Sequence, residues 1–120
     1  MKKILVVEDD IELAENISDI LILHGYIVSV VSNGERGKQL LFRYHPDLII
    51  SDVLMPGMNG IEFVRSIRKE PLHRNTPIIF FSAKVADDDV QKGKDAGANL
   101  YLKKPFDTDM LVESVSKLLA

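Results

Sequence analysis

Short apolar runs alternate with longer amphipathic stretches along the whole chain. The runs hold three to five residues, are rich in β-branched side chains, and show little alternation of apolar with polar positions. Runs without alternation are typical of strands that are buried on both faces, as in a parallel sheet. They occupy residues 4–7, 27–31, 48–50, 78–81 and 100–102.

The stretches between these runs have a helical period. In the first, apolar residues recur at intervals of three and four after Asp10, a good N-cap residue, and the pattern stops at Gly25. Further helices are expected over residues 34–44, 60–69 and 87–96, and from 107 onward. Strand and helix alternate five times, which predicts an α/β fold: a doubly wound, five-stranded parallel sheet with right-handed crossovers and helices on both faces.

The composition narrows the class of protein. The chain has 120 residues, so one domain over 1–120 is expected, and 46% hydrophobic with 28% charged residues is an ordinary globular balance. Fifteen basic against 18 acidic residues give a net charge of −3, which argues against nucleic-acid binding through a broad basic face. Without cysteine, disulfides and thiolate metal sites are excluded. The apolar start is too short for a signal peptide or a membrane span, so we expect a cytoplasmic protein.

Polar residues whose side chains could bind a ligand or take part in a reaction follow four of the five runs. In an open parallel sheet, ligands bind beyond the carboxyl ends of the strands. Glu8 and Asp9 follow the first run, Asp52 ends the third strand, Ser82 ends the fourth, and Lys104 follows the fifth. We expect the first and third strands to be neighbours, which would bring the three carboxylates together.

A cluster of carboxylates predicts a cation site. Two carboxylates about 4 Å apart repel by roughly 4 kcal/mol at an effective dielectric constant near 20, and proteins relieve such repulsion with a proton or a cation. Oxygen ligands without Cys or His suit Mg²⁺. Lys104 adds a positive charge and Ser82 a hydroxyl donor, so the site could hold an anion beside the metal. Asp52 is then a candidate nucleophile for a phosphoryl group.

Ordinary structural roles compete with these interpretations. Acids after strands commonly cap helices, and this is the role we expect for Asp10. The acidic run 87–89 is expected to complement a helix dipole. None of the three histidines lies at a strand end, so ligand or phosphodonor roles are not expected, and His73 is expected in a polar loop. Tyr101 fits a packed core aromatic as well as a functional residue.

Three segments resemble the receiver domain of bacterial two-component response regulators, the CheY-like superfamily. Residues 4–10 resemble its acidic-pair strand, residues 46–60 its phosphoacceptor strand and loop, and residues 96–106 its last strand with a lysine-proline turn. One such segment would be suggestive, whereas three in order at the right separations are highly specific. The likeness covers essentially the whole chain and implies a flavodoxin-like (βα)5 sheet with strand order 2-1-3-4-5.

The resemblance implies a set of metal ligands. Asp52 corresponds to the phosphoacceptor, which also binds the metal. Asp9 binds Mg²⁺ directly and Glu8 binds it through water, with Mn²⁺ as a possible substitute. The backbone carbonyl of Leu54 is the remaining ligand from the protein.

The resemblance also implies the residues that report phosphorylation. Ser82 is the switch hydroxyl and Tyr101 the aromatic switch residue. Lys104 contacts the phosphoryl oxygens, and we prefer it to Lys103 because the family places its lysine immediately before the proline. The bond between Lys104 and Pro105 is typically cis in the family.

The implied function is a phosphoacceptor signalling switch rather than a conventional enzyme. Such a domain catalyses its own phosphorylation and autodephosphorylation. Its donor is a phosphohistidine on a sensor histidine kinase or a histidine phosphotransfer protein. Its target is a downstream output protein or domain, reached through the surface of the fourth helix, fifth strand and fifth helix. A monomer or a phosphorylation-dependent dimer is expected, without direct contact to nucleic acid or membrane.

Two other functions are compatible with an α/β sheet. A small Mg²⁺-dependent phosphohydrolase of the haloacid dehalogenase type also uses an aspartyl phosphate, but it carries D-x-D after its first strand, where this chain has Glu8 and Asp10. A flavodoxin-like cofactor carrier needs a Ser/Thr/Gly loop there to bind phosphate. The acids at positions 8–10 would instead repel a flavin phosphate.

The expected helix over residues 87–96 has a thin apolar face. Gly93 lies inside it, and glycine costs about 1 kcal/mol relative to alanine in a helix. We therefore expect this helix to be the least stable one and the main moving part. On helix propensity alone, Gly93→Ala is expected to stabilise the fold.

Overall fold

The sheet has the predicted topology. The computed structural model describes residues 1–55, 57–83 and 86–120, so Pro56 in the loop after β3 and residues 84–85 lie outside the description. The strands are parallel and ordered β2-β1-β3-β4-β5, which confirms the fold class and the strand order. They are β1 (Lys3–Val7), β2 (Ile27–Val31), β3 (Leu48–Asp52), β4 (Ile78–Ser82) and β5 (Leu100–Lys103).

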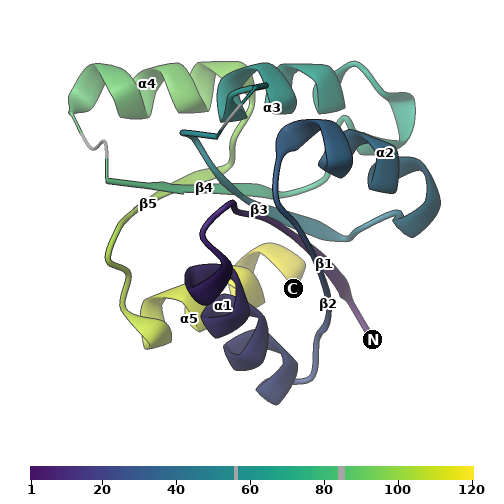
Figure 1. Ribbon diagram of the computed structural model, residues 1–120, viewed down its shortest axis with the longest axis vertical. Helices are drawn as coiled ribbons and strands as arrows, with labels where there is room; N and C mark the ends of the chain where they lie inside the picture. The colour runs from purple at the N-terminus through teal and green to yellow at the C-terminus, as the bar shows by residue number, and fades with distance from the viewer. Residues whose placement is uncertain (56, 84–85) are drawn as a thin grey trace.

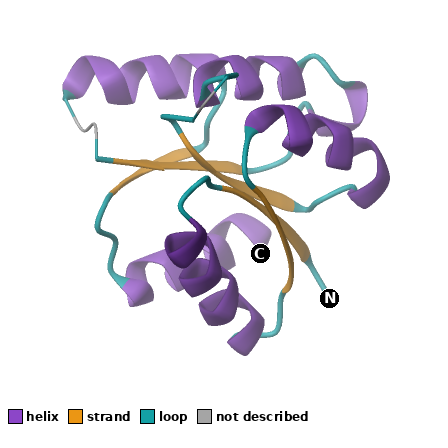
Figure 2. Ribbon diagram, in the orientation of Figure 1, coloured by secondary structure: helices purple, strands orange, loops and turns teal. Residues whose placement is uncertain are grey.

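Helices cover both faces of this sheet. They are α1 (Ile11–Leu23), α2 (Gly34–Tyr44), α3 (Gly60–Arg68), α4 (Asp87–Ala96) and α5 (Thr108–Leu119), with a short 3₁₀ helix at Pro71–His73. Figures 1 and 2 show α1 and α5 on one face and α2, α3 and α4 on the other. Each face has its own apolar core. β3 and β4 are buried along their whole length, which is why their sequences show no alternation.

Side-chain caps fix the start of four helices. Asp10, Asn33, Asn59 and Asp107 each accept a hydrogen bond from a backbone N–H in the first turn of the helix that follows. The cap role predicted for Asp10 is therefore confirmed, with a distance of 3.2 Å to the Leu13 nitrogen. Such bonds satisfy N–H groups that have no partner within the helix.

His73 does not lie in a polar loop, so that expectation is wrong. Its side chain is buried in the 3₁₀ helix, and its Nδ1 is 2.9 Å from the Thr76 hydroxyl. The ring stacks on His45 with 6.0 Å between centroids. Burial, with the nearby charge of His45, lowers the pKa of His73, so the fold favours the neutral ring. These contacts indicate a core residue.

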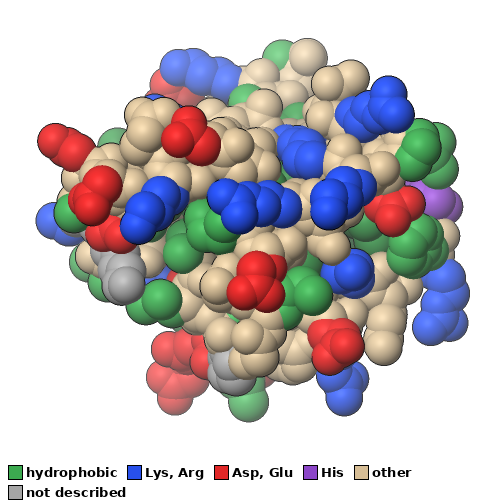
Figure 3. Space-filling model, turned by 90° about the horizontal axis from the view of Figure 1, so that it is seen from above, with side chains coloured by type: hydrophobic (Ala, Val, Ile, Leu, Met, Phe, Trp, Pro, Cys, Tyr) green, Lys and Arg blue, Asp and Glu red, His purple; other side chains and the backbone are tan. Residues whose placement is uncertain are grey.

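The outer faces of the helices are charged. Figure 3 shows Lys, Arg, Asp and Glu side chains spread over the layer of α2, α3 and α4. Acidic side chains gather at the end where α4 begins, at positions 87–89, beside the positive end of its dipole as expected. None of the helices in the described ranges combines the length and apolar content needed to cross a bilayer.

α4 begins without a side-chain cap, and this generates a stability prediction. Ala86 has the extended backbone of an N-cap residue (φ −61°, ψ 148°) but no side chain that could accept a hydrogen bond. We expect Ala86→Ser to raise the free energy of unfolding by about 1 kcal/mol, since an N-cap serine satisfies a free N–H. Urea denaturation measures the change. The matched control is Asn33→Ala, which should lose a similar amount, and an unchanged midpoint for Ala86→Ser would contradict the expectation.

Candidate functional site

The carboxyl ends of β1 and β3 bring three acids together. Glu8 directly follows β1 and Asp52 ends β3, and these strands pair with Val7 opposite Ser51. Glu8, Asp9 and Asp52 each offer a carboxylate oxygen, and these oxygens all lie within 4.8 Å of one another. Glu8 and Asp52 are buried whereas Asp9 is exposed. The predicted cluster is therefore formed, with one acid open to solvent.

Lys104 connects two of these acids. Its Nζ donates to Glu8 Oε1 at 2.8 Å and to Asp52 Oδ2 at 2.9 Å. The ammonium group lies over the Phe81 ring, 4.7 Å from the centroid, and the Lys104 backbone N–H donates to the Ser82 carbonyl at 2.9 Å. The neighbouring lysine at position 103 is exposed, so it is the lysine next to the proline that reaches the acids. The peptide bond between Lys104 and Pro105 is cis, as the family resemblance implies.

One lysine does not neutralise three carboxylates. Burial raises the pKa of Glu8 from 4.5 to about 7; the hydrogen bond from Lys104 opposes this, while Asp9 and the charge of Asp52 add to it. Burial alone would lower the pKa of Lys104, but the two carboxylates outweigh it and the pKa is raised. Glu8 therefore retains a proton at a pH where an exposed glutamate is ionised.

The backbone of residues 54 and 60 lies close to Asp52. The Leu54 N–H donates to Asp52 Oδ1 at 3.1 Å, which puts the backbone of this residue next to the carboxylate. A Cβ at Gly60 would lie 2.5 Å from the Asp52 carbonyl oxygen and 2.8 Å from Val53 Cα. Gly60 thus allows the start of α3 to pass directly over the end of β3. This role of Gly60 was not predictable from the sequence, where the local signal is a glycine at the start of a helix.

Ser82 and Tyr101 lie together on the neighbouring strands. Ser82 is buried at the end of β4, and Tyr101 is half-buried in β5. Burial raises the pKa of Tyr101, and a side-chain hydrogen bond with Ser82 opposes the shift. The Tyr101 ring packs edge-on against Phe80 with 6.1 Å between centroids. Tyr101 is therefore both packed and hydrogen-bonded, so the two interpretations of this residue are compatible.

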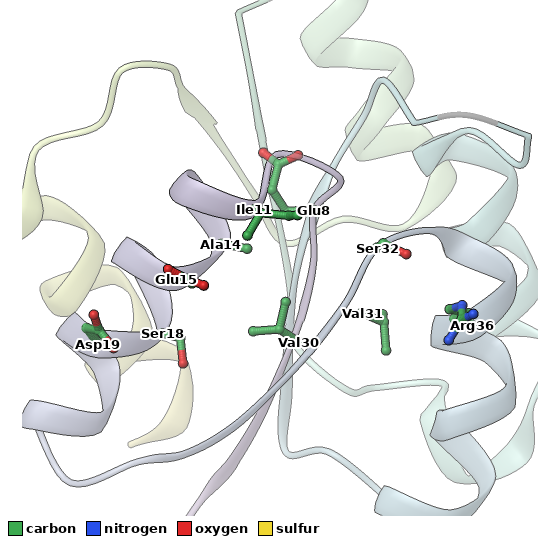
Figure 4. A pocket seen from close by; sticks show the side chains of 10 residues that line it. All are labelled: Glu8, Ile11, Ala14, Glu15, Ser18, Asp19, Val30, Val31, Ser32 and Arg36. Carbon is green, nitrogen blue, oxygen red and sulfur yellow. The ribbon is translucent and has the colours of Figure 1, made fainter.

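A separate pocket lies between α1 and β2. It has a volume of about 410 Å³, and Figure 4 shows Glu15 and Asp19 of α1 on one side and Arg36 of α2 on the other. Glu8 lies at one end of the pocket with its carboxyl group turned away from Val30. The pocket thus contributes no further carboxylate to the cluster, and the chemistry remains at the strand ends.

The site can hold a cation and an oxyanion side by side. Buried and exposed carboxylate oxygens form the donor set that Mg²⁺ prefers. Lys104 places a positive charge 2.9 Å from Asp52, where the oxygens of a group bound to this carboxylate would gather. The site therefore lies at the carboxyl edge of a doubly wound sheet, which is where α/β domains of this class bind their ligands.

Comparison with known proteins identifies the family. Residues 4–116 match the family model of the response regulator receiver domain, and the chain belongs to this family. It is 39% identical over 118 residues to "Probable transcriptional regulator ycf29" of Pyropia yezoensis, covering 98% of this chain and 53% of that protein. It is 36% identical over 114 residues to "DNA-binding response regulator MtrA" of Mycobacterium tuberculosis, covering 95% and 49%.

Solved structures agree with this assignment. The chemotaxis response regulator CheY4 of Vibrio cholerae superposes with a TM-score of 0.94 at 34% identity, covering 99% of each chain. This chain, however, spans about half the length of the curated relatives above. The comparisons therefore establish a receiver domain of two-component signalling, whose relatives include transcriptional regulators.

The raised pKa of Glu8 predicts a pH-dependent stability. In the metal-free protein, folded Glu8 keeps its proton up to about pH 7, whereas the unfolded chain releases it near 4.5. This group therefore stabilises the fold fully below pH 4.5, and the stabilisation is lost as pH rises to 7. Urea denaturation in EDTA at several pH values measures the effect.

The matched control for this experiment is Glu8→Gln, which cannot titrate. Both proteins contain His73, whose lowered pKa makes the fold more stable as pH rises, so this contribution is removed when their unfolding free energies are subtracted. The difference in unfolding free energy between the unmodified protein and Glu8→Gln should fall steadily from pH 5 to 7. A difference that stays constant over this range would show that Glu8 is ionised throughout.

Proposed function

We propose that this receiver domain accepts a phosphoryl group on Asp52 from a phosphohistidine of a partner protein. The observation that carries the proposal is the surroundings of the Asp52 carboxylate. Carboxylate oxygens of Glu8 and Asp9 lie within 4.8 Å of one of its oxygens, and Lys104 Nζ lies 2.9 Å from its Oδ2. The donor is a sensor histidine kinase or a histidine phosphotransfer protein. The target that responds to the phosphorylated domain is an output protein or domain. The family membership supports both partners.

The transfer needs little from the protein beyond position and charge. A carboxylate oxygen of Asp52 attacks phosphorus, the new P–O bond forms, and the P–N bond electrons return to the leaving imidazole. Lys104 neutralises part of the negative charge on the transferred oxygens. Glu8, Asp9, Asp52 and the Leu54 carbonyl would hold Mg²⁺, or Mn²⁺ in its place. When bound, the metal supplies further positive charge to the same oxygens.

The signal then leaves the site through Ser82 and Tyr101. A phosphoryl group brings almost two negative charges and new acceptor oxygens to the end of β3. The Ser82 hydroxyl lies at the end of the adjacent strand, β4, and is hydrogen-bonded to Tyr101. A movement of Ser82 toward the phosphoryl group would therefore be transmitted to Tyr101 and to the surface formed by α4, β5 and α5.

A phosphohydrolase is less well supported by the geometry. In the haloacid dehalogenase type, the general acid that protonates the leaving group is the second Asp of the D-x-D motif, and Asp10 occupies that position here. Asp10 accepts a hydrogen bond from the Leu13 N–H as the N-cap of α1. Its side chain is therefore engaged in holding the helix start, and this favours a switch over an enzyme with turnover.

The first prediction of this proposal concerns the site of phosphorylation. Incubation with Mg²⁺ and acetyl phosphate should raise the intact mass by one phosphoryl group, and Asp52→Asn should abolish the gain because the amide is not a nucleophile. Lys104→Ala should slow labelling strongly, while the matched control Lys103→Ala should not, since only Lys104 reaches Asp52. Persistent label in Asp52→Asn would refute Asp52 as the phosphoacceptor. Equal effects of the two lysine variants would refute the role given to Lys104.

The second prediction concerns the metal. Mg²⁺ binds the folded state and relieves repulsion among the three acids, so millimolar Mg²⁺ should raise the melting temperature. Asp9→Asn removes a ligand that takes no part in the contacts of Lys104 with Glu8 and Asp52, and this variant should lose the response. The exposed Asp19 offers a control, since Asp19→Asn should keep it. A melting temperature indifferent to Mg²⁺ in the unmodified protein would count against the site.

A further inference from the structure

The backbone of α4 passes directly over the ring of Tyr101. α4 packs on β5 in the upper layer of the molecule (Figure 1), and Gly93 is buried at the contact. A Cβ at position 93 would lie 2.9 Å from Cδ2 of Tyr101 and 3.1 Å from Cδ2 of Phe80. Real side chains essentially never make the shorter of these contacts. Gly93 lies within the regular helix, so the absence of a side chain is what the structure requires.

The ring that fills this space is held on its other sides as well. Phe80 of β4 packs against Tyr101 edge-on at 6.1 Å. The phenol group is joined to the Ser82 side chain by a hydrogen bond. Ser82 ends β4, next to the end of β3 where Asp52 lies. A short path of direct contacts therefore runs from the α4 backbone through the Tyr101 ring and the Ser82 hydroxyl to the phosphoacceptor region.

We infer that Gly93 is a positioning residue for Tyr101: its missing side chain leaves the space in which the ring lies with its hydroxyl group on Ser82. The inference rests on the proposed function, because it takes the Ser82–Tyr101 pair to report phosphorylation of Asp52. A methyl group at position 93 displaces either the ring or the helix. In both cases the position of the Tyr101 ring relative to α4 and Ser82 is changed.

This assignment contradicts the expectation drawn from helix propensity. Gly93→Ala was expected to stabilise the fold because alanine is the better helix former. The 2.9 Å approach to the Tyr101 ring makes the same substitution destabilising, since an overpacked core must shift its side chains or backbone. Glycine at position 93 therefore makes the isolated helix less stable but allows its backbone to lie close to the Tyr101 ring.

A double-mutant cycle in unfolding free energy tests the contact. Gly93→Ala should lower the folding equilibrium constant about fivefold or more in the unmodified background. In the Tyr101→Ala background the ring is gone and Phe80, 3.1 Å from the new Cβ, can move into the vacated space, so most of the loss caused by Gly93→Ala should disappear. The matched control is Gly37→Ala in α2, whose Cβ would lie 2.9 Å from the Phe63 ring. It should destabilise equally in both backgrounds, and an equal loss for Gly93→Ala in both would overturn the inference.

A second readout tests positioning rather than stability. Beryllofluoride with Mg²⁺ imitates the phosphoryl group, and fluorine NMR measures its occupancy at Asp52. At equal occupancy, amide hydrogen exchange in α4 should respond in the unmodified protein and in Gly37→Ala, but not in Gly93→Ala. An undiminished response in Gly93→Ala would overturn the inference. Failure of the unmodified protein to bind beryllofluoride would refute the proposed function instead, while the double-mutant cycle would still test the contact.

Discussion

The hydrogen bonds from Lys104 Nζ to Glu8 and Asp52 are the interaction on which the site depends. They join residues 96 and 52 positions apart in the chain, and they connect the ends of β5, β1 and β3. β4 lies between β5 and β3, so the lysine has to cross it, with its ammonium group over the Phe81 ring. One side chain thus links the ends of three strands that the sheet already holds side by side. Because taking charged groups out of water costs free energy, these contacts are weak evidence for a gain in stability, and their clear effect is to hold the ammonium group beside both carboxyl groups.

The charge left over by these pairs accounts for the affinity expected for a cation. With Glu8 protonated, Lys104 balances Asp52 and the exposed Asp9 remains. A divalent cation would displace the proton and complete the neutralisation. The metal-free fold therefore stores an unfavourable interaction among its acids, which a bound cation would relieve. Sites with a function commonly hold such locally unfavourable arrangements, because the remainder of the fold maintains them.

The sequence was sufficient to predict the helices and strands and the edge of the sheet at which the acidic cluster lies. Non-alternating runs marked β3 and β4 because both faces of these strands are buried, and the rule that ligands bind at carboxyl ends selected Glu8, Asp9, Asp52 and Lys104. Close approaches between distant segments were not predictable. The fit of Gly93 to the Tyr101 ring depends on how α4 packs on β5, and no local pattern encodes this packing. The burial of His73 likewise depends on the 3₁₀ helix and on contacts with Thr76 and His45.

The interactions that hold α4 are concentrated toward its C-terminal end. Gly93 and Ala96 are its buried residues, and the following Gly97 carbonyl accepts two hydrogen bonds from the Arg68 guanidinium, at 2.7 and 3.1 Å. The Arg68 side chain fits there because Gly97, at φ +121°, has no Cβ to meet it. At the other end the helix lacks a side-chain cap, and its first residues are exposed acids. Local opening requires the least free energy where contacts are fewest. If the proposed path through Tyr101 operates, its signal would reach the middle of α4 and have its largest effect toward the N-terminal end, while Arg68 would keep the other end in place.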